Sequence, residues 1–236
     1  MYAYITLDIE TVPDQRPHVS DYIREQIEKE KQSIKAPGNY TKPETIAAYI
    51  EAERAKLDES FGDRLARCSL RGETAQIICI GWAGDDETVQ TIYGHDEREL
   101  LAGWIERLSS VGPSRPVIVG HNVAEFDLRI LWQRSVIHGL RLPSWLPVKA
   151  KPWDATVFDT MTQWNPSSQA RISCDALCRT LGIQSPKRAG MDGSKVWQAY
   201  QEGRLQEIAE YCARDVEAER SIYRRMVGAP FLSIAA

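Results

Sequence analysis

The chain has 236 residues, of which 43% are hydrophobic and 26% charged, as in an ordinary globular protein with one large domain. Its net charge of −4 argues against a basic protein that coats nucleic acid, although metal ions could still bring nucleic acid to acidic side chains. We find neither an apolar run long enough to span a membrane nor a secretory signal, and the five scattered cysteines suit reduced thiols, so we expect a cytoplasmic protein without membrane contacts.

The first predicted element is a strand that ends in two acids, Asp8 and Glu10, within residues 4–11. Residues two apart in a strand point to the same face, so these carboxylates lie side by side while Ile5, Leu7 and Ile9 bury on the other face. Two adjacent carboxylates repel each other unless one is protonated or a cation lies between them. Because hard divalent cations prefer carboxylate oxygens, the pair indicates a metal site.

A polar stretch follows at residues 13–73, with a charged run at 24–31 and a break at 36–39. Apolar residues at helical spacing after Pro43 predict a helix there. The stretch is too long for a plain loop, so we predict a helical insertion within a single domain of residues 1–236. It could be a solvated appendage or it could contact a substrate.

Strands and helices then alternate, which predicts an α/β domain with a mixed five-stranded sheet flanked by helices. The further strands are predicted at residues 76–82, 88–93, 116–119 and 155–159. The helices are predicted around residues 100–108 and at 124–138, 174–181 and 194–226, with Gly203 interrupting the last and Ser194 as an N-cap.

Two further acids are candidate ligands. Asp127 falls in the first turn of a predicted helix, where the helix dipole already favours an acid, so a structural role is a sufficient explanation for this residue alone. Asp215 falls on the apolar stripe of the last helix, four residues after Tyr211. A buried carboxylate without a partner is costly, so either a salt bridge or a metal is expected there, and a metal is the better explanation. Asp159, at the end of a strand, could support the site or could only cap a turn.

In chain order the candidates form three patterns: Asp8-x-Glu10, Asn122-x-x-x-Phe126-Asp127 and Tyr211-x-x-x-Asp215. This constellation resembles the three motifs of the DEDD superfamily of 3′-5′ exonucleases, which have a ribonuclease H-like fold. The tyrosine is similar to that of the tyrosine branch; the histidine branch would need His where Glu210 stands. Residues 190–197 and 207–212 resemble stand-alone exonucleases akin to the proofreading domain of family B DNA polymerases.

The resemblance implies hydrolysis of the terminal phosphodiester of single-stranded DNA or frayed 3′ ends, releasing nucleoside 5′-monophosphates with two Mg²⁺ or Mn²⁺ ions. It implies that the metal ligands are Asp8, Glu10, Asp127 and Asp215. Tyr211 would orient the attacking water. The terminal nucleotide would contact Thr11, Asn122 and Phe126, with Lys149, Lys151 and Trp153 as further candidates for strand contacts. A polymerase or another replication or repair protein is a possible partner in trans.

Three other interpretations stay open. An exoribonuclease would carry the same motifs, because the ribose 2′-hydroxyl is recognised by contacts outside them. A non-catalytic nucleic-acid-binding or protein-interaction module is less favoured, because all four acids and the tyrosine are present. A purely structural α/β domain would leave the acid on the core stripe of the last helix without a purpose.

Overall fold

The computed structural model describes residues 3–109, 111, 115–151, 153–166 and 170–228, in which five strands form one mixed sheet. The strands are β1 (Tyr4–Pro13), β2 (Ala75–Gly84), β3 (Gln90–Tyr93), β4 (Val117–Gly120) and β5 (Val157–Asp159). Their order is β3-β2-β1-β4-β5, with β1 antiparallel to β2 and parallel to β4. The predicted mixed five-stranded sheet is confirmed.

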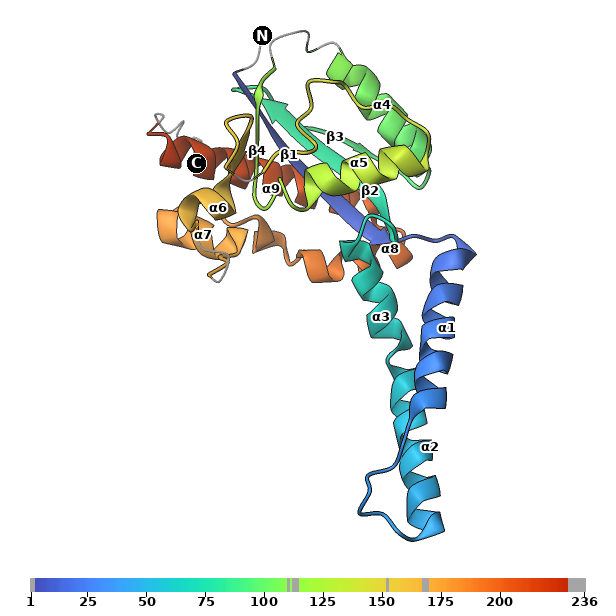
Figure 1. Ribbon diagram of the computed structural model, residues 1–236. Coiled ribbons are helices and arrows are strands. Elements are labelled where there is room, and N and C mark those ends of the chain that lie inside the picture. Colours follow the sequence, from blue (N-terminus) through green and yellow to red (C-terminus); the bar gives the residue numbers. More distant parts are fainter. Residues whose placement is uncertain (1–2, 110, 112–114, 152, 167–169, 229–236) are drawn as a thin grey trace.

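Helices cover both faces of the sheet (Figure 1). Ile5, Leu7 and Ile9 of β1 bury together on one face, against α4 (Glu97–Ser109) and α5 (Asp127–Ile137). The opposite face packs against α8 (Val196–Gln201) and α9 (Leu205–Met226), with α7 (Cys174–Leu181) beside α9. Shorter elements are α6 (Thr160–Trp164) and the 3₁₀ helices η1 (Cys68–Leu70), η3 (Pro186–Ala189) and η4 (Gly193–Lys195). None of the helices described combines the length and hydrophobicity of a membrane span.

Two helix starts differ from the sequence prediction. α5 begins at Asp127 rather than Ala124, because the preceding turn is held by Asp159, whose carboxylate accepts the backbone N–H groups of Asn122 (3.0 Å) and Ala124 (3.2 Å). The prediction of Ser194 as an N-cap is wrong. Asp192 caps the 3₁₀ helix η4, and its side chain accepts the N–H of Ser194 at 3.0 Å.

A β-bulge interrupts the pairing of β1 with β2 directly after the second acid of β1. Glu10 lies opposite Cys79 and Thr11 opposite Ile77, so Ile78 has no partner in the register. Ile78 and Cys79 consequently both bury on the α8–α9 side. Such a bulge changes the direction of the side chains that follow it, here those of the segment leading into the insertion.

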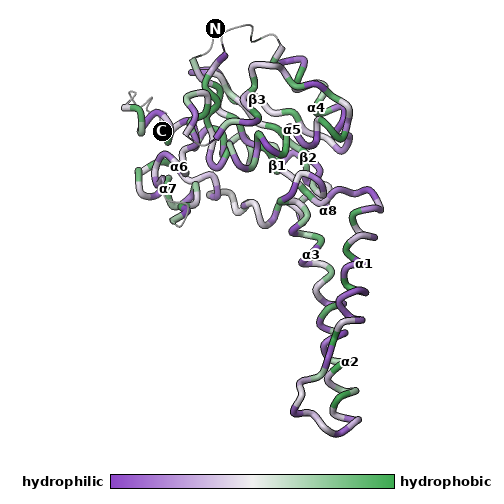
Figure 2. The backbone as a smooth tube through the Cα atoms, in the orientation of Figure 1, coloured by the Kyte–Doolittle hydropathy of each residue, from purple (hydrophilic) through white to green (hydrophobic). Residues whose placement is uncertain are grey.

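The segment between β1 and β2 forms three helices, α1 (Pro17–Ser33), α2 (Pro43–Glu59) and α3 (Phe61–Arg67), which we call the arm. The arm projects away from the sheet (Figure 1), and hydrophilic and hydrophobic segments alternate along it (Figure 2). Proline at the first helical position starts α1 and α2, where its missing N–H costs nothing. The arm has a small core of Val19, Ile23, Ile27 and Cys68, with Leu57, Phe61 and Leu65 packed against it.

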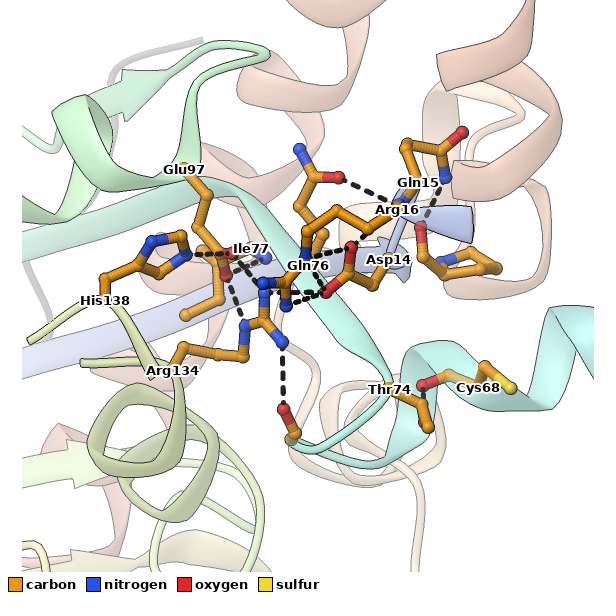
Figure 3. A network of polar contacts seen from close by, with 12 residues as sticks. Asp14, Gln15, Arg16, Cys68, Thr74, Gln76, Ile77, Glu97, Arg134 and His138 are labelled. Carbon is orange, nitrogen blue, oxygen red and sulfur yellow. Dashed lines mark hydrogen bonds and ion pairs between the residues drawn. The ribbon is translucent and has the colours of Figure 1, made fainter. Parts of the chain in front are cut away.

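A buried polar network anchors the base of the arm to the body (Figure 3). Arg134 of α5, which is 1% exposed, forms ion pairs with Glu97 of α4 and with Asp14, and it donates a hydrogen bond to the carbonyl of Gly72. Asp14 precedes the arm and Gly72 follows it, so one side chain holds both connections. Burial tends to raise the pKa of Asp14, but hydrogen bonds from Arg16 and the charges of both arginines outweigh it and lower that pKa.

Candidate active site

Asp8 and Glu10 project from β1 towards α9, on the face opposite Ile5, Leu7 and Ile9, and Asp215 of α9 meets them there. One carboxylate oxygen from each of Asp8, Glu10 and Asp215 lies within 4.8 Å of the other two. Glu10 and Asp215 are both 8% exposed. The fold therefore joins acids from the two ends of the chain in one largely buried cluster.

Asp127 approaches the same strand from its open edge. β4 pairs with β1 only through Tyr4, Ile5 and Thr6, so the N–H of Ile9 has no partner in that ladder. The side chain of Asp127, at the first position of α5, accepts this N–H at 3.0 Å. Because Ile9 lies between Asp8 and Glu10, Asp127 is held beside both acids, although it is not one of the three residues whose oxygens converge within 4.8 Å.

The pKa values of all four acids are raised. Burial is the largest cause for Asp8, followed by the charges of Glu219, Glu10, Asp215 and Asp127. Burial also raises the pKa of Glu10 well above its usual range, and it raises that of Asp127 to about 8. For Asp215, burial exceeds the opposing effects of Tyr211 and Arg214 and raises the pKa to about 6. The folded chain thus gathers four carboxylates whose charged forms are disfavoured, and the charges of Arg214 and Lys187 offset this only in part at Asp215.

The donor set fits a hard divalent cation. Within the described residues, none of Asp8, Glu10, Asp127 and Asp215 forms an ion pair with Lys, Arg or His. Oδ2 of Asp8 is buried and has no hydrogen-bond partner in this part of the chain. A buried carboxylate oxygen without a partner is costly, and coordination to a metal would remove that cost.

Tyr211 lies one turn before Asp215 on α9 and is 6% exposed. Its hydroxyl donates a hydrogen bond to Asp215, and this bond helps to lower the pKa of that carboxyl against the effect of burial. Burial and the charges of Asp215, Glu10 and Asp8 raise the pKa of Tyr211 well above its usual value. Tyr211 is therefore a neutral phenol that faces the acids.

Glu219 is an acid of this cluster that the sequence motifs did not single out. It lies one turn after Asp215 on α9 and is 3% exposed; Oε1 accepts the N–H of His121 at 3.1 Å, and Oε2 is buried without a partner among the described residues. Of the charges that raise the pKa of Asp8, that of Glu219 has the largest effect after burial. The signal was present in the sequence, because Glu219 shares the apolar stripe on which Asp215 was noticed.

The other predicted contact residues flank the acids. The hydroxyl of Thr11, next to Glu10, donates to the carbonyl of Ser69 at 2.7 Å. Asn122 has a positive φ of 64°, and its Oδ1 is buried without a partner within the described ranges. Phe126 is half-buried against the core and directly precedes Asp127. Asp159 caps α6, holds the β4–α5 turn that carries Asn122, and is among the charges that raise the pKa of Asp127.

The residues before β5 that were predicted to contact the nucleic-acid strand lie at the surface. Lys149, Lys151 and Trp153 are exposed, with Trp153 at 74%. No interaction joins them to the acid cluster in the part of the chain that the structure describes, so their role stays a prediction.

Comparison with known proteins identifies the fold and a family. The sequence model of a family described as predicted 3′-5′ exonucleases related to the exonuclease domain of PolB matches residues 70–229, more than half of the chain. This range contains Asn122, Asp127, Tyr211 and Asp215, whereas Asp8 and Glu10 precede it. The resemblance seen in the sequence motifs is confirmed by this match. No curated protein sequence matches the chain.

Among solved structures, the family B DNA polymerase from the hyperthermophilic archaeon Pyrobaculum calidifontis is similar. The TM-score is 0.57 at 13% identity, and the likeness covers 96% of this chain but 25% of the polymerase. The chain thus spans about a quarter of the polymerase's length. At this identity the likeness establishes the fold.

Proposed function

Because the chain belongs to the family of 3′-5′ exonucleases related to the exonuclease domain of PolB, we propose that it hydrolyses the terminal phosphodiester of single-stranded DNA with two metal ions. The products are nucleoside 5′-monophosphates. The observation that carries this proposal is the convergence of Asp8, Glu10 and Asp215 within 4.8 Å, with Asp127 held against the same strand.

Asp8, Glu10, Asp127 and Asp215 are the proposed ligands, because they offer oxygen donors that form no ion pair with Lys, Arg or His among the described residues. Bound Mg²⁺ or Mn²⁺ would lower the pKa of a water molecule and stabilise the charge that develops on the leaving 3′-oxygen. The raised pKa values of the four acids mean that these carboxylates release protons when a cation binds.

Tyr211 orients the attacking water in this proposal. Its hydroxyl is held by Asp215 and stays protonated at neutral pH, so it is suited to positioning a water molecule by a hydrogen bond rather than to acting as an anion. The buried, unpaired Oδ1 of Asn122 is an acceptor for a sugar or base group of the terminal nucleotide, with Thr11 and Phe126 as neighbouring contacts.

An exoribonuclease remains the second candidate. The acids and Tyr211 serve the same chemistry on RNA, and discrimination depends on contacts to the 2′-hydroxyl. Matched DNA and RNA strands of one sequence, 5′-labelled and incubated in parallel, distinguish the two by their rates of shortening.

The test of the function is incubation of the purified protein with 5′-labelled single-stranded DNA, with Mg²⁺, with Mn²⁺ and with chelator. We expect stepwise shortening from the 3′ end that the chelator abolishes. Glu10→Gln should slow release by on the order of 1,000-fold. Glu106→Gln is the matched control, because Glu106 is exposed on α4. Equal rates in wild type and Glu10→Gln would refute the assignment of the site.

A further inference from the structure

A cavity lies where the arm joins the body, between α1 and the segment formed by α3 and η1. Its volume is about 600 Å³. Val19, Ile23 and Cys68 from the core of the arm contribute apolar surface to it, and Tyr22 and three arginines contribute polar groups. We call this cavity the arm-base groove.

The groove is cationic although the chain as a whole has a net charge of −4. Arg64, Arg67 and Arg71 line it, and Glu73 is the acid in its lining. Arg64 is paired with Glu30 at 2.7 Å. Arg67 and Arg71 are exposed and have no ion-pair partner among the described residues. Two guanidinium groups are therefore available in one groove, and their planar donors match phosphate oxygens.

An aromatic side chain stands beside these arginines. Tyr22 of α1 lines the groove and is 55% exposed, with His18 one turn before it in the same lining. Leu70, directly before Arg71, is 62% exposed. Exposed aromatic rings interleaved with cations are the arrangement by which proteins bind single strands, with bases stacked on rings and phosphates held by charge.

The groove is tied to the strand that carries the acids. The hydroxyl of Thr11, the residue after Glu10, donates to the carbonyl of Ser69, and Ser69 lies between Cys68 and Arg71 of the groove segment. The N–H of Asp14 donates to the carbonyl of Thr74, another lining residue, at 2.8 Å. The buried network around Arg134 fixes both chain connections of the arm (Figure 3). The segment that lines the groove is thus hydrogen-bonded to the residue that follows Glu10.

We propose that the arm-base groove binds the nucleic-acid strand upstream of its 3′-terminal nucleotide, with Arg67 and Arg71 on phosphates and Tyr22 stacked on a base. The ligand is single-stranded DNA, whose phosphates match the arginines and whose bases match the ring, and RNA is the comparison strand in the test. The direction of the strand rests on the proposed function; the binding itself does not.

The test measures binding without hydrolysis. Fluorescence anisotropy in chelator follows a labelled DNA strand, and in parallel an RNA strand, of about 20 nucleotides over a range of salt concentrations. For Arg67→Gln/Arg71→Gln we expect weaker binding and a slope of log K against log salt that is shallower by about 1.4, since each phosphate contact on a single strand contributes about 0.7. Tyr22→Ala should weaken binding by about 10-fold.

The matched control for Arg71→Gln is Arg54→Gln, which likewise removes one positive charge, here from an exposed position of α2 outside the groove lining. Its affinity and salt slope should equal those of wild type. Melting curves check that each variant folds. If the double variant does not fold, the same binding measurement is made on Arg71→Gln alone, because Arg71 lies outside the helices of the arm.

The two proposals fail separately. An unchanged salt slope in the double variant, or the same loss in Arg54→Gln, would overturn the groove proposal even if nucleotide release were normal. If wild type released no nucleotide with any metal while the groove variants still lost strand binding as expected, the proposed hydrolysis would fail and the groove assignment would stand.

Discussion

Within the acid cluster, single side chains have separable roles. Tyr211 and Glu219 lie one turn before and one turn after Asp215 on the same face of α9, and both are buried. Tyr211 contributes a hydrogen-bond donor, whereas Glu219 contributes a charge and an unpaired oxygen. Tyr211→Phe and Glu219→Gln each change one polar atom, so they separate the orienting of a water molecule from the holding of a cation.

Tyr211→Phe should lower the rate of nucleotide release by about 100-fold while leaving metal affinity near that of wild type, because in the proposed reaction the hydroxyl positions the water and is not a metal ligand. Single-turnover kinetics and Mn²⁺ titration provide the two measurements. A rate equal to that of wild type would make Tyr211 a packing residue.

Glu219→Gln should weaken divalent-cation binding by about 10- to 100-fold, in the range of residues that support metal ligands. The amide oxygen can still accept the N–H of His121, so the substitution removes charge without removing that hydrogen bond. Calorimetric Mn²⁺ titration measures the change. Glu210→Gln, at an exposed position of the same helix, is the control, and equal affinities in both variants would exclude a role for Glu219.

At the scale of elements, the cluster forms where β1, α5 and α9 meet. β1 presents Asp8 and Glu10 on the face that packs against α9, and α9 contributes Asp215 there. The side chain of the first residue of α5, Asp127, is hydrogen-bonded to the edge of β1. Packing these three elements together forces negative groups out of water. The stability of this junction should therefore depend on pH and on metal.

The metal-free protein should lose stability as pH rises. The pKa of Asp215 is raised from 3.8 to about 6 and that of Asp127 from 3.8 to about 8, so the folded state binds protons more tightly than the unfolded chain. This contribution is complete below the unfolded pKa near 3.8 and is lost as pH rises through about 6 and then about 8.

Melting temperatures in chelator at about pH 5 and about pH 8 test this, and saturating Mn²⁺ should stabilise more at the higher pH, where fewer protons compete. A metal-free protein that is more stable at the higher pH would contradict the assignment.

At the scale of the whole molecule, a body and an arm are joined by a network of buried charges. Arg134 and Glu97 are almost fully buried, whereas the side chain of Arg16, at the edge of the same network, is 49% exposed. A buried charge is tolerated only when it is paired, so substitution of Arg134 should destabilise the fold much more than substitution of Arg16.

Arg134→Met should destabilise the protein by about 3–5 kcal/mol, because it leaves the buried carboxylates of Glu97 and Asp14 without their partner. Arg16→Gln should cost at most about 1 kcal/mol, as expected for a partly solvated pair. Urea unfolding of both variants measures the difference. A small effect of Arg134→Met would mean that the network does not hold the arm in place.

Local patterns predicted much of the fold. The helix predicted at residues 174–181 is α7, with the bounds that the structure has, and the alternation in β1 placed Ile5, Leu7 and Ile9 on one buried face. The start of one helix was predicted wrongly because a residue distant in the sequence changes the local structure. α5 starts later than its periodicity indicates because Asp159, from another strand, holds the preceding turn.

The sequence alone determined that Asp8 and Glu10 share a face, since side-chain alternation along a strand is a local property of the backbone. It also determined the spacing of Tyr211, Asp215 and Glu219 along one helical stripe. Only the tertiary structure decided that the two groups of acids meet, that Asp127 occupies the open edge of β1, and that a cationic groove lies beside Thr11. Those distances depend on packing between segments far apart in the chain, which no periodicity encodes.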